Sequence, residues 1–223
     1  MKHLIAISLA FLLATPLLSR AENMSARIYE ATHILEQRQG SADPIPAEIL
    51  ANAKGVAICT ITKGGIGIGG QGGEGIVMVR HIGPNGKVWR APSAFNISGG
   101  SIGAQLGLST IHYIIILNTE NAIGQFVGNG KIKLDATATG TAGEDTAAEA
   151  ASTRDLEARA VLVYRDSGGL FGGATIGGSS IEVKDEINQI AYGEHVHVRD
   201  ILDGSVPLPK SADRLYALLD GGR

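Results

Sequence analysis

The sequence predicts an α+β fold: a strongly curved, mainly antiparallel, glycine-rich and barrel-like β-sheet, with helices at the N-terminus, in mid-chain and at the C-terminus. Helical periodicity is concentrated near the two ends and strand-like stretches fill the middle, an order typical of α+β folds. Three glycine-rich stretches also alternate like strands. Rows of positions without side chains allow a sheet to curve tightly or a neighbour to come close.

The densest of these stretches is residues 63–75, in which eight of thirteen residues are glycine. At a strand's period of two, Gly65, Gly67 and Gly69 share one face. Residues 99–107 and 169–179 have the same alternating pattern, with a row of small residues on one face of the expected strand. Each glycine inside a strand costs roughly 0.5–1 kcal/mol relative to alanine, so we expect a close neighbour, which is another strand, a helix or a ligand.

The first 21 residues have the pattern of an export signal. A short basic start precedes an apolar run at residues 4–18, and small residues, Ser19 and Ala21, lie at the −3 and −1 positions before Glu22. The apolar run is shorter than the roughly 20 residues that a transmembrane helix needs. We therefore expect a signal peptide at residues 1–21 and a single domain at residues 22–223, in an exported protein that is periplasmic, envelope-associated or secreted.

Charge and cysteine content exclude two further classes. Without Lys2 and Arg20 the chain has 17 basic and 22 acidic residues, a formal charge of −5. Nucleic-acid binding needs a basic footprint, so no nucleic-acid partner is expected. The single cysteine, Cys59, excludes an internal disulfide, and its apolar, strand-like surroundings predict a small core side chain.

Helices are expected in four places. Met24, Ile28 and Leu35 recur at helical spacing within residues 23–39, and Gly40 follows as a stop. This first helix has two alternatives, docking on the sheet or lying on a membrane surface. The other helices are expected over residues 46–54 and 119–127 and from residue 211 onward, where proline, threonine or serine suits the helix start.

Strands are expected between these helices, and residues 83–86 form a hairpin turn. One strand is expected to break near residues 109–110, and residues 140–159, which are acidic and rich in alanine and threonine, are expected to form a mobile connection. The expected strands are residues 55–62, 76–80, 87–91, 97–117, 131–139, 160–165, 170–176 and 180–184.

Two motifs match the sequence patterns of enzyme or cofactor signatures, but the secondary structure predicted around them does not match. Residues 65–70 read G-x-G-x-x-G, but a dinucleotide site needs a helix to begin there, and more strand follows. Residues 99–103 read G-x-S-x-G around Ser101, with His195 and His197 downstream. A hydrolase needs a strand-to-helix elbow at this serine, whereas strand alternation continues past it.

His195 and His197 are also the weak candidate pair for a metal. On a strand, their spacing would place two imidazoles on one face, as some metal sites do. No cysteine is nearby, and two histidines are also common as exposed side chains. We therefore expect no metal and no cofactor.

Six basic residues lie near the ends of expected strands or helices. If they converge, they form a site for anionic headgroups beside glycine amides, which bind anions themselves. If they scatter, they are ordinary solvated charges. These candidate lipid-binding residues are Lys54, Lys63, Arg80, Lys131, Lys133 and Arg165.

The order of short motifs along the chain is more specific than any one of them. They are Ile45, Pro46, Leu50, residues 53–58, Lys63, Gly69, Gly70, Gly73, Gly75, Arg80, residues 89–92, Phe95, residues 99–107, Phe126, residues 169–173, Gly178, Ser179, Asn188, Tyr192, Gly193, residues 201–204, Pro207 and Pro209. In this combination the chain resembles the SYLF domain family, also called the Ysc84 actin-binding domain family, over roughly residues 25–220. It departs from the family at His112, where aspartate is frequent, and at residues 140–143, where a Gly-Pro pair is frequent.

The resemblance implies lipid binding without catalysis. Eukaryotic relatives bind phosphoinositide membranes, helped by an N-terminal amphipathic segment, and some bind actin. An exported protein does not meet actin in its own cell, so we expect an anionic phospholipid or membrane surface as the partner. The alternatives are a structural or protein-partner-binding envelope protein and a serine hydrolase that uses Ser101.

Overall fold

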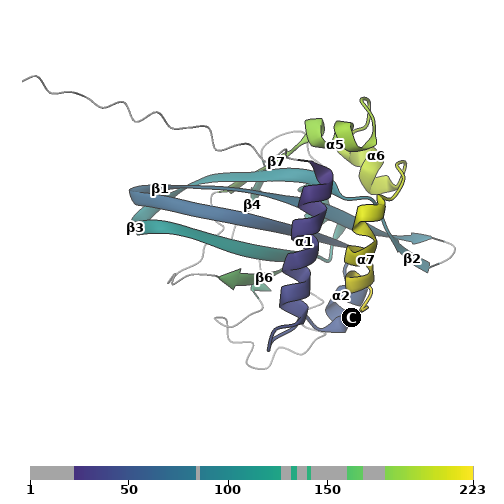
Figure 1. Cartoon of the computed structure of the whole chain (residues 1–223), viewed down its shortest axis with the longest axis horizontal. Helices are drawn as coiled ribbons and strands as arrows, with labels where there is room; N and C mark the ends of the chain where they lie inside the picture. The colour runs from purple at the N-terminus through teal and green to yellow at the C-terminus, as the bar shows by residue number, and fades with distance from the viewer. Residues whose placement is uncertain are drawn as a thin grey trace, which may run out of the picture.

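The computed structural model describes residues 23–83, 86–126, 132–134, 140–141, 160–167 and 179–222. These residues form one large, mainly antiparallel sheet with helices at the N-terminus, in mid-chain and at the C-terminus (Figure 1). The predicted α+β class is confirmed. Over the described strands the sheet curves but does not close into a barrel.

Two very long strands, β1 (Gly55–Gly83) and β3 (Ser93–Leu117), form the centre of the sheet as an antiparallel pair. The short strand β2 (Gly86–Trp89) pairs with the end of β1 and completes the expected hairpin. The break expected near residues 109–110 is wrong. Ser109 and Thr110 keep their pairing with Lys63 and Thr62, so β3 runs on without interruption.

Strand β1 is folded back so that its second half packs against its first half. A Cβ added to Gly75 would lie 2.5 Å from the Cβ of Cys59, and one added to Gly73 would lie 2.9 Å from the Cα of Ile61. Real side chains essentially never come this close, so glycine is required at both positions. The close neighbour expected for the glycine stretch is therefore another part of the same strand. Figure 1 shows the paired ribbons of β1 and β3 reversing at the end of the molecule away from α7.

Shorter strands extend both halves of this folded ribbon. Strand β6 (Val161–Ser167) pairs with the C-terminal half of β3 and in turn with β5 (Gly140–Thr141), the one parallel pair among the described strands. Strand β7 (Ser179–Val183) pairs with the N-terminal half of β3 and with β4 (Ile132–Leu134). The expected strand at residues 170–176 and most of residues 140–159 lie outside the described residues.

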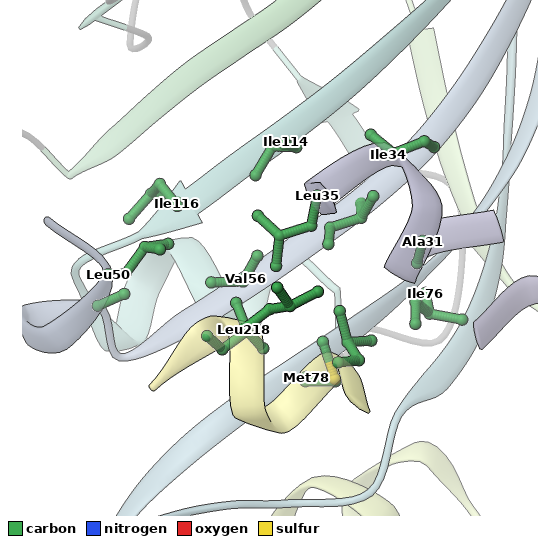
Figure 2. Close-up of a cluster of buried hydrophobic side chains, with 14 of the residues drawn as sticks. Ala31, Ile34, Leu35, Leu50, Val56, Ile76, Met78, Ile114, Ile116 and Leu218 are labelled. Carbon is green, nitrogen blue, oxygen red and sulfur yellow. The ribbon is translucent and has the colours of Figure 1, made fainter. Parts of the chain in front are cut away.

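The helices cover one face of the sheet. They are α1 (Met24–Gln39), α2 (Ala47–Asn52) and α7 (Asp213–Leu219), which is preceded by the short helix η2 (Lys210–Ala212). Figure 2 shows Ala31, Ile34 and Leu35 of α1, Leu50 of α2 and Leu218 of α7 meeting Val56, Ile76 and Met78 of β1 and Ile114 and Ile116 of β3. Of the two alternatives for the first helix, docking on the sheet is the one that the structure shows.

The other face of the sheet is its concave inner face, with a core of its own. This inner core contains Ala57, Cys59 and Ile61 of β1 together with Phe95, Tyr113 and Val163 of the neighbouring strands. Phe126, which follows α3 (Glu120–Gly124), packs edge-to-face on Phe95 with 5.2 Å between ring centres. The Cys59 thiol is buried here, and burial raises its pKa to about 12, as suits the expected core side chain.

Arg27 of α1 fixes the helix to the sheet. The residue is only 4% exposed. Its Nη1 atom donates to the carbonyl oxygens of Phe95, at 2.6 Å, and Gly75, at 3.2 Å, while Nη2 donates to Asn96 Oδ1 at 2.8 Å and pairs with Glu74 at 3.2 Å. A buried guanidinium is stable only when its charge and its donors are met in this way.

Two helices near the C-terminus were not expected from the sequence, α5 (Asp185–Tyr192) and α6 (Val198–Asp203). The first docks through Asn188, whose side chain accepts from the amide of Ala94 at 2.8 Å and donates to Ser93 Oγ at 2.9 Å. The mid-chain helix α3 is shorter than expected and ends at Gly124, although Thr119 caps it as predicted.

Replacing Gly75 by alanine is expected to destabilise the fold by about 1–3 kcal/mol, because the new methyl group overlaps the main chain and Cβ of Cys59. Gly72→Ala is the matched control, since nothing lies within 4 Å of a Cβ at that position. Urea unfolding of both variants measures the difference in the free energy of unfolding. Equal stability of the two variants would contradict the close contact within β1.

Candidate functional site

Two of the six predicted basic residues, Lys63 and Arg165, share the inner face of the sheet. Lys63 of β1 lies opposite Ser109 of β3, and Arg165 of β6 lies opposite Tyr113 of β3. Alternate residues of these strands contribute to the inner core, and all four positions fall on that face. We call Lys63, Ser109, Tyr113 and Arg165 the inner polar site.

Lys63 is the most unusual member of this site. It is 6% exposed, and the described part of the chain offers its ammonium group neither a carboxylate nor a hydrogen-bond acceptor. Loss of hydration lowers the pKa of Lys63, and the nearby positive charge of Arg165 lowers it further. The positive charges of Lys63 and Arg165 therefore repel each other on the apolar inner face of the sheet.

Two hydroxyl groups of the inner polar site also lack partners. Tyr113 Oη and Ser109 Oγ are buried, and neither has a hydrogen-bond partner among the described residues. Burial raises the pKa of Tyr113 to about 12, so its hydroxyl stays protonated and able to donate at neutral pH. Buried hydroxyl groups are normally paired, so these two are exceptions within the described part of the chain, as are four buried arginine Nε atoms.

Arg80 lies at the opposite end of the sheet and has partners for both of its terminal nitrogens. Its guanidinium donates to the carbonyl oxygens of Leu50 and Ala51, at 3.0 and 2.7 Å, and to Asp220 Oδ1 at 2.7 Å. It also stacks over Trp89, with 4.1 Å to the ring centre. These contacts connect α2, β1, β2 and the end of α7, so Arg80 has a structural role whatever else it does.

The remaining candidates do not join either group. Lys54 is half exposed and pairs with Glu120 at 3.3 Å. For Lys133 only the backbone, within β4, is described, and Lys131 lies outside the described residues. The structure thus brings together Lys63 and Arg165 and places Lys54 and Arg80 elsewhere.

An open groove of about 390 Å³ lies beside Arg80. Its walls include Arg199, which the sequence analysis did not single out, together with His81, Glu120 and Asp203. No spacing signal marked Arg199, because it lies in α6, one of the helices that were not expected. With acidic and basic side chains both on its walls, the groove has no strong preference for one sign of charge.

The G-x-G-x-x-G and G-x-S-x-G motifs both lie in strands. Residues 65–70 belong to β1, and no helix begins there. Ser101 pairs with Gly69 in the middle of β3. The strand-to-helix elbow that a G-x-S-x-G nucleophile needs is therefore absent at this serine, and the hydrolase alternative loses its structural basis.

His195 and His197 are not on a strand, contrary to the geometry considered for a metal pair. His197 is the N-cap residue of α6, where its backbone amide donates to Asp200 at 2.9 Å, and His195 lies exposed in the preceding loop. Among the described residues, no three His, Cys, Asp or Glu side chains are grouped to hold a metal ion. Nor does that part of the chain contain a helix with the length and apolar character to span a membrane.

Lys63→Met is expected to raise the free energy of unfolding near neutral pH, because the folded state then buries no unpaired ammonium. Folding lowers the pKa of Lys63 below 10.5. In the alkaline range beneath that value the unfolded chain binds more protons, so the unmodified protein gains stability as the pH rises. The advantage of the variant should therefore shrink toward pH 10.5.

Urea unfolding at a series of pH values measures this advantage. Lys87→Met, which removes an exposed lysine of β2, is the control. A stabilisation by Lys63→Met that stays constant through the alkaline range, or a destabilisation at neutral pH, would contradict the assignment of an unpaired buried charge.

Comparison with known proteins places this chain in a family. The model of the family Ysc84, described as "Las17-binding protein actin regulator", matches residues 98–221. Human SH3 domain-containing YSC84-like protein 1 is 35% identical over 209 residues, 91% of this chain and 58% of that protein. LAS seventeen-binding protein 3 of Saccharomyces cerevisiae is 34% identical over 183 residues, 81% of this chain and 39% of that protein. The chain thus spans less than two thirds of either relative, and since the family model covers more than half of it, the protein belongs to the Ysc84 family, as the resemblance to SYLF domains predicted.

Proposed function

We propose that the protein is a non-enzymatic lipid-binding protein of the cell envelope that recognises anionic headgroups. The observation that carries this proposal is Lys63, a buried ammonium group that has no counter-charge among the described residues and lies near a second cation, Arg165. Burying an unpaired charge is costly, and a bound anion would supply the missing partner.

The surroundings of Lys63 support contact with a lipid surface. Leu108, the neighbour of Ser109 in β3, is 79% exposed and lies opposite Gly64. The glycine-rich end of the ribbon therefore carries a large exposed apolar side chain, on the face of the sheet opposite to Lys63. An apolar contact combined with a positive charge is the combination that holds peripheral proteins on anionic membranes.

Vesicle co-sedimentation tests this proposal. The protein is expected to sediment with phosphatidylglycerol vesicles and not with phosphatidylcholine vesicles, and more weakly at high salt, because salt screens charge attraction. Lys63→Met should weaken binding about tenfold or more, the usual effect of losing a charged hydrogen bond. Lys87→Met removes the same charge from the far end of the sheet and should leave this binding nearly unchanged.

The absence of binding to both vesicle types at low salt would overturn the proposal. Equal binding to both vesicle types would show that the protein does not recognise the charge of the headgroup. Equal losses in Lys63→Met and Lys87→Met would mean that net charge, and not the inner polar site, attracts the membrane.

Export belongs to the same proposal. The basic start, the apolar run and the small residues before Glu22 support cleavage after Ala21. The protein recovered from a bacterial envelope fraction is expected to begin at Glu22, and mass spectrometry of its N-terminal peptide checks this. An intact Met1 in the protein from that fraction would contradict it.

Binding of a protein partner is the second candidate function. It is favoured by the description of the family, which names Las17 binding and actin regulation. The groove beside Arg80, with Arg199 and Asp203 on its walls, is the place for such a contact, because its mixed charges suit a protein surface. Actin itself is not expected as a partner of an exported protein.

A further inference from the structure

The end of the β1–β3 ribbon that lies away from α7 extends beyond the other described strands of the sheet (Figure 1). Residues 64–70 of β1 pair here with residues 100–108 of β3, and we call these two segments the distal ribbon. Strands β6 and β7 pair with β3 at residues 111–117 and 95–99. Among the described strands, the distal ribbon is therefore two strands wide.

The helices, which lie on the outer face of the sheet, stop short of the distal ribbon. Glu30 of α1 accepts a hydrogen bond from Thr60 Oγ1 at 2.5 Å. At the next outer position of β1, the hydroxyl groups of Thr62 and Thr110 form an exposed pair, 3.2 Å apart. The following outer position of β3 is Leu108, which is 79% exposed. The described helices therefore leave Leu108 uncovered.

The distal ribbon has an unusual composition, because none of its residues is charged or aromatic. Strand alternation places even-numbered residues of β1 and β3 on the outer face, as Ile58 and Ile114 under the helices show. The large apolar residues of the distal ribbon all have even numbers, on both sides of the register shift in β1. They are Ile66, Ile68, Ile102, Leu106 and Leu108. The sequence thus assigns this apolar row to the outer face.

A lipid surface fits this composition better than a protein surface does. Protein interfaces are anchored by aromatic and arginine side chains, and the distal ribbon has neither. Proteins at a membrane surface combine apolar contact with positive charge, and Lys63 directly precedes the uncharged segment of β1. The first charged residue after that segment is Glu74, whose carboxylate pairs with Arg27 at 3.2 Å. Strand β1 therefore brings no uncompensated negative charge toward the lipid.

We propose that the distal ribbon is the part of the protein that enters the membrane surface, with Leu108 among the acyl chains and Lys63 near the level of the headgroups. This inference rests on the proposed function and specifies which part of the chain contacts lipid. Insertion is shallow, because a two-stranded ribbon has amide and carbonyl groups along its outer edges that hydrocarbon does not satisfy.

A fluorescent label at position 108 tests the insertion. Leu108→Cys is labelled with an environment-sensitive bimane, and Ile190→Cys in α5 is the matched control, because Ile190 is also apolar and 75% exposed. The native thiol of Cys59 is buried and its pKa is raised to about 12, so the label does not react there. With phosphatidylglycerol vesicles, the emission of the label at position 108 is expected to shift to shorter wavelength, and that at position 190 to stay unchanged.

Lipids that carry a nitroxide quencher measure the depth of insertion. A nitroxide near the headgroup end of the acyl chain should quench the label at position 108 more strongly than one near the far end. Unchanged emission at position 108 in protein that sediments with the vesicles would overturn the inference. A shift that appears without vesicles and grows with protein concentration would assign the distal ribbon to contact between copies of this chain, and would also overturn it.

Substitution by aspartate gives an independent test. Leu108→Asp and Ile190→Asp add the same charge at similarly exposed apolar positions. Leu108→Asp is expected to weaken binding to phosphatidylglycerol vesicles about tenfold or more, because the lipid contact of a leucine is lost, whereas Ile190→Asp should leave binding nearly unchanged. Leu108→Gln removes the apolar contact without adding charge and should weaken binding several-fold. Urea unfolding should show all three variants to be as stable as the unmodified protein, because both positions are exposed.

The failure of this inference and the failure of the proposed function give different results. Equal losses of binding in Leu108→Asp and Ile190→Asp would overturn the contact of the distal ribbon with lipid. Sedimentation that depends on Lys63 and not on Leu108 would also overturn that contact and leave the proposed function standing. The absence of sedimentation with any vesicle would overturn both.

Discussion

The contact between the two halves of β1 is the constraint on which the rest of the structure depends. Gly73 and Gly75 bring one stretch of main chain against another, closer than any side chain would allow. This contact folds the β1–β3 ribbon into two halves. They enclose the inner core, to which Phe95 and Ile111 belong. It also frees the opposite face for the helices, so that one chain reversal creates both cores.

The close contact explains why the fold tolerates so much glycine. Glycine in a strand sacrifices side-chain packing and adds unfolded-state entropy, which only a gain elsewhere can offset. Here the gain is burial on two faces: Ile58 and Ile76 pack under the helices, while Cys59 and Val77 pack inside. Arg27 then joins the helical layer to the carbonyl oxygens of Gly75 and Phe95, next to the contact itself.

How far the sequence predicts this structure depends on the range of the interaction involved. Local sequence signals were sufficient to predict α1, whose N-cap is Asn23, and the turn between β1 and β2, because neighbouring residues determine both structures. They were insufficient for α5 and α6, and for the continuity of β3 at Ser109, because long-range packing decides these. The inner polar site was predictable only in part. Lys63 and Arg165 could be selected from the sequence because they are basic, whereas Tyr113 and Ser109 join them only through the register of three strands.

A comparison of cations within the molecule separates structural charges from those available to a ligand. Arg27 is buried to nearly the same extent as Lys63, yet it has two carbonyl oxygens, an amide oxygen and a carboxylate around it. Arg80 and Lys54 likewise face a carboxylate. The fold therefore supplies partners where a cation serves stability. Lys63 has no such partner in the described structure. Since the same chain surrounds both terminal nitrogens of Arg27 with acceptors, a ligand is the better explanation for the isolation of Lys63.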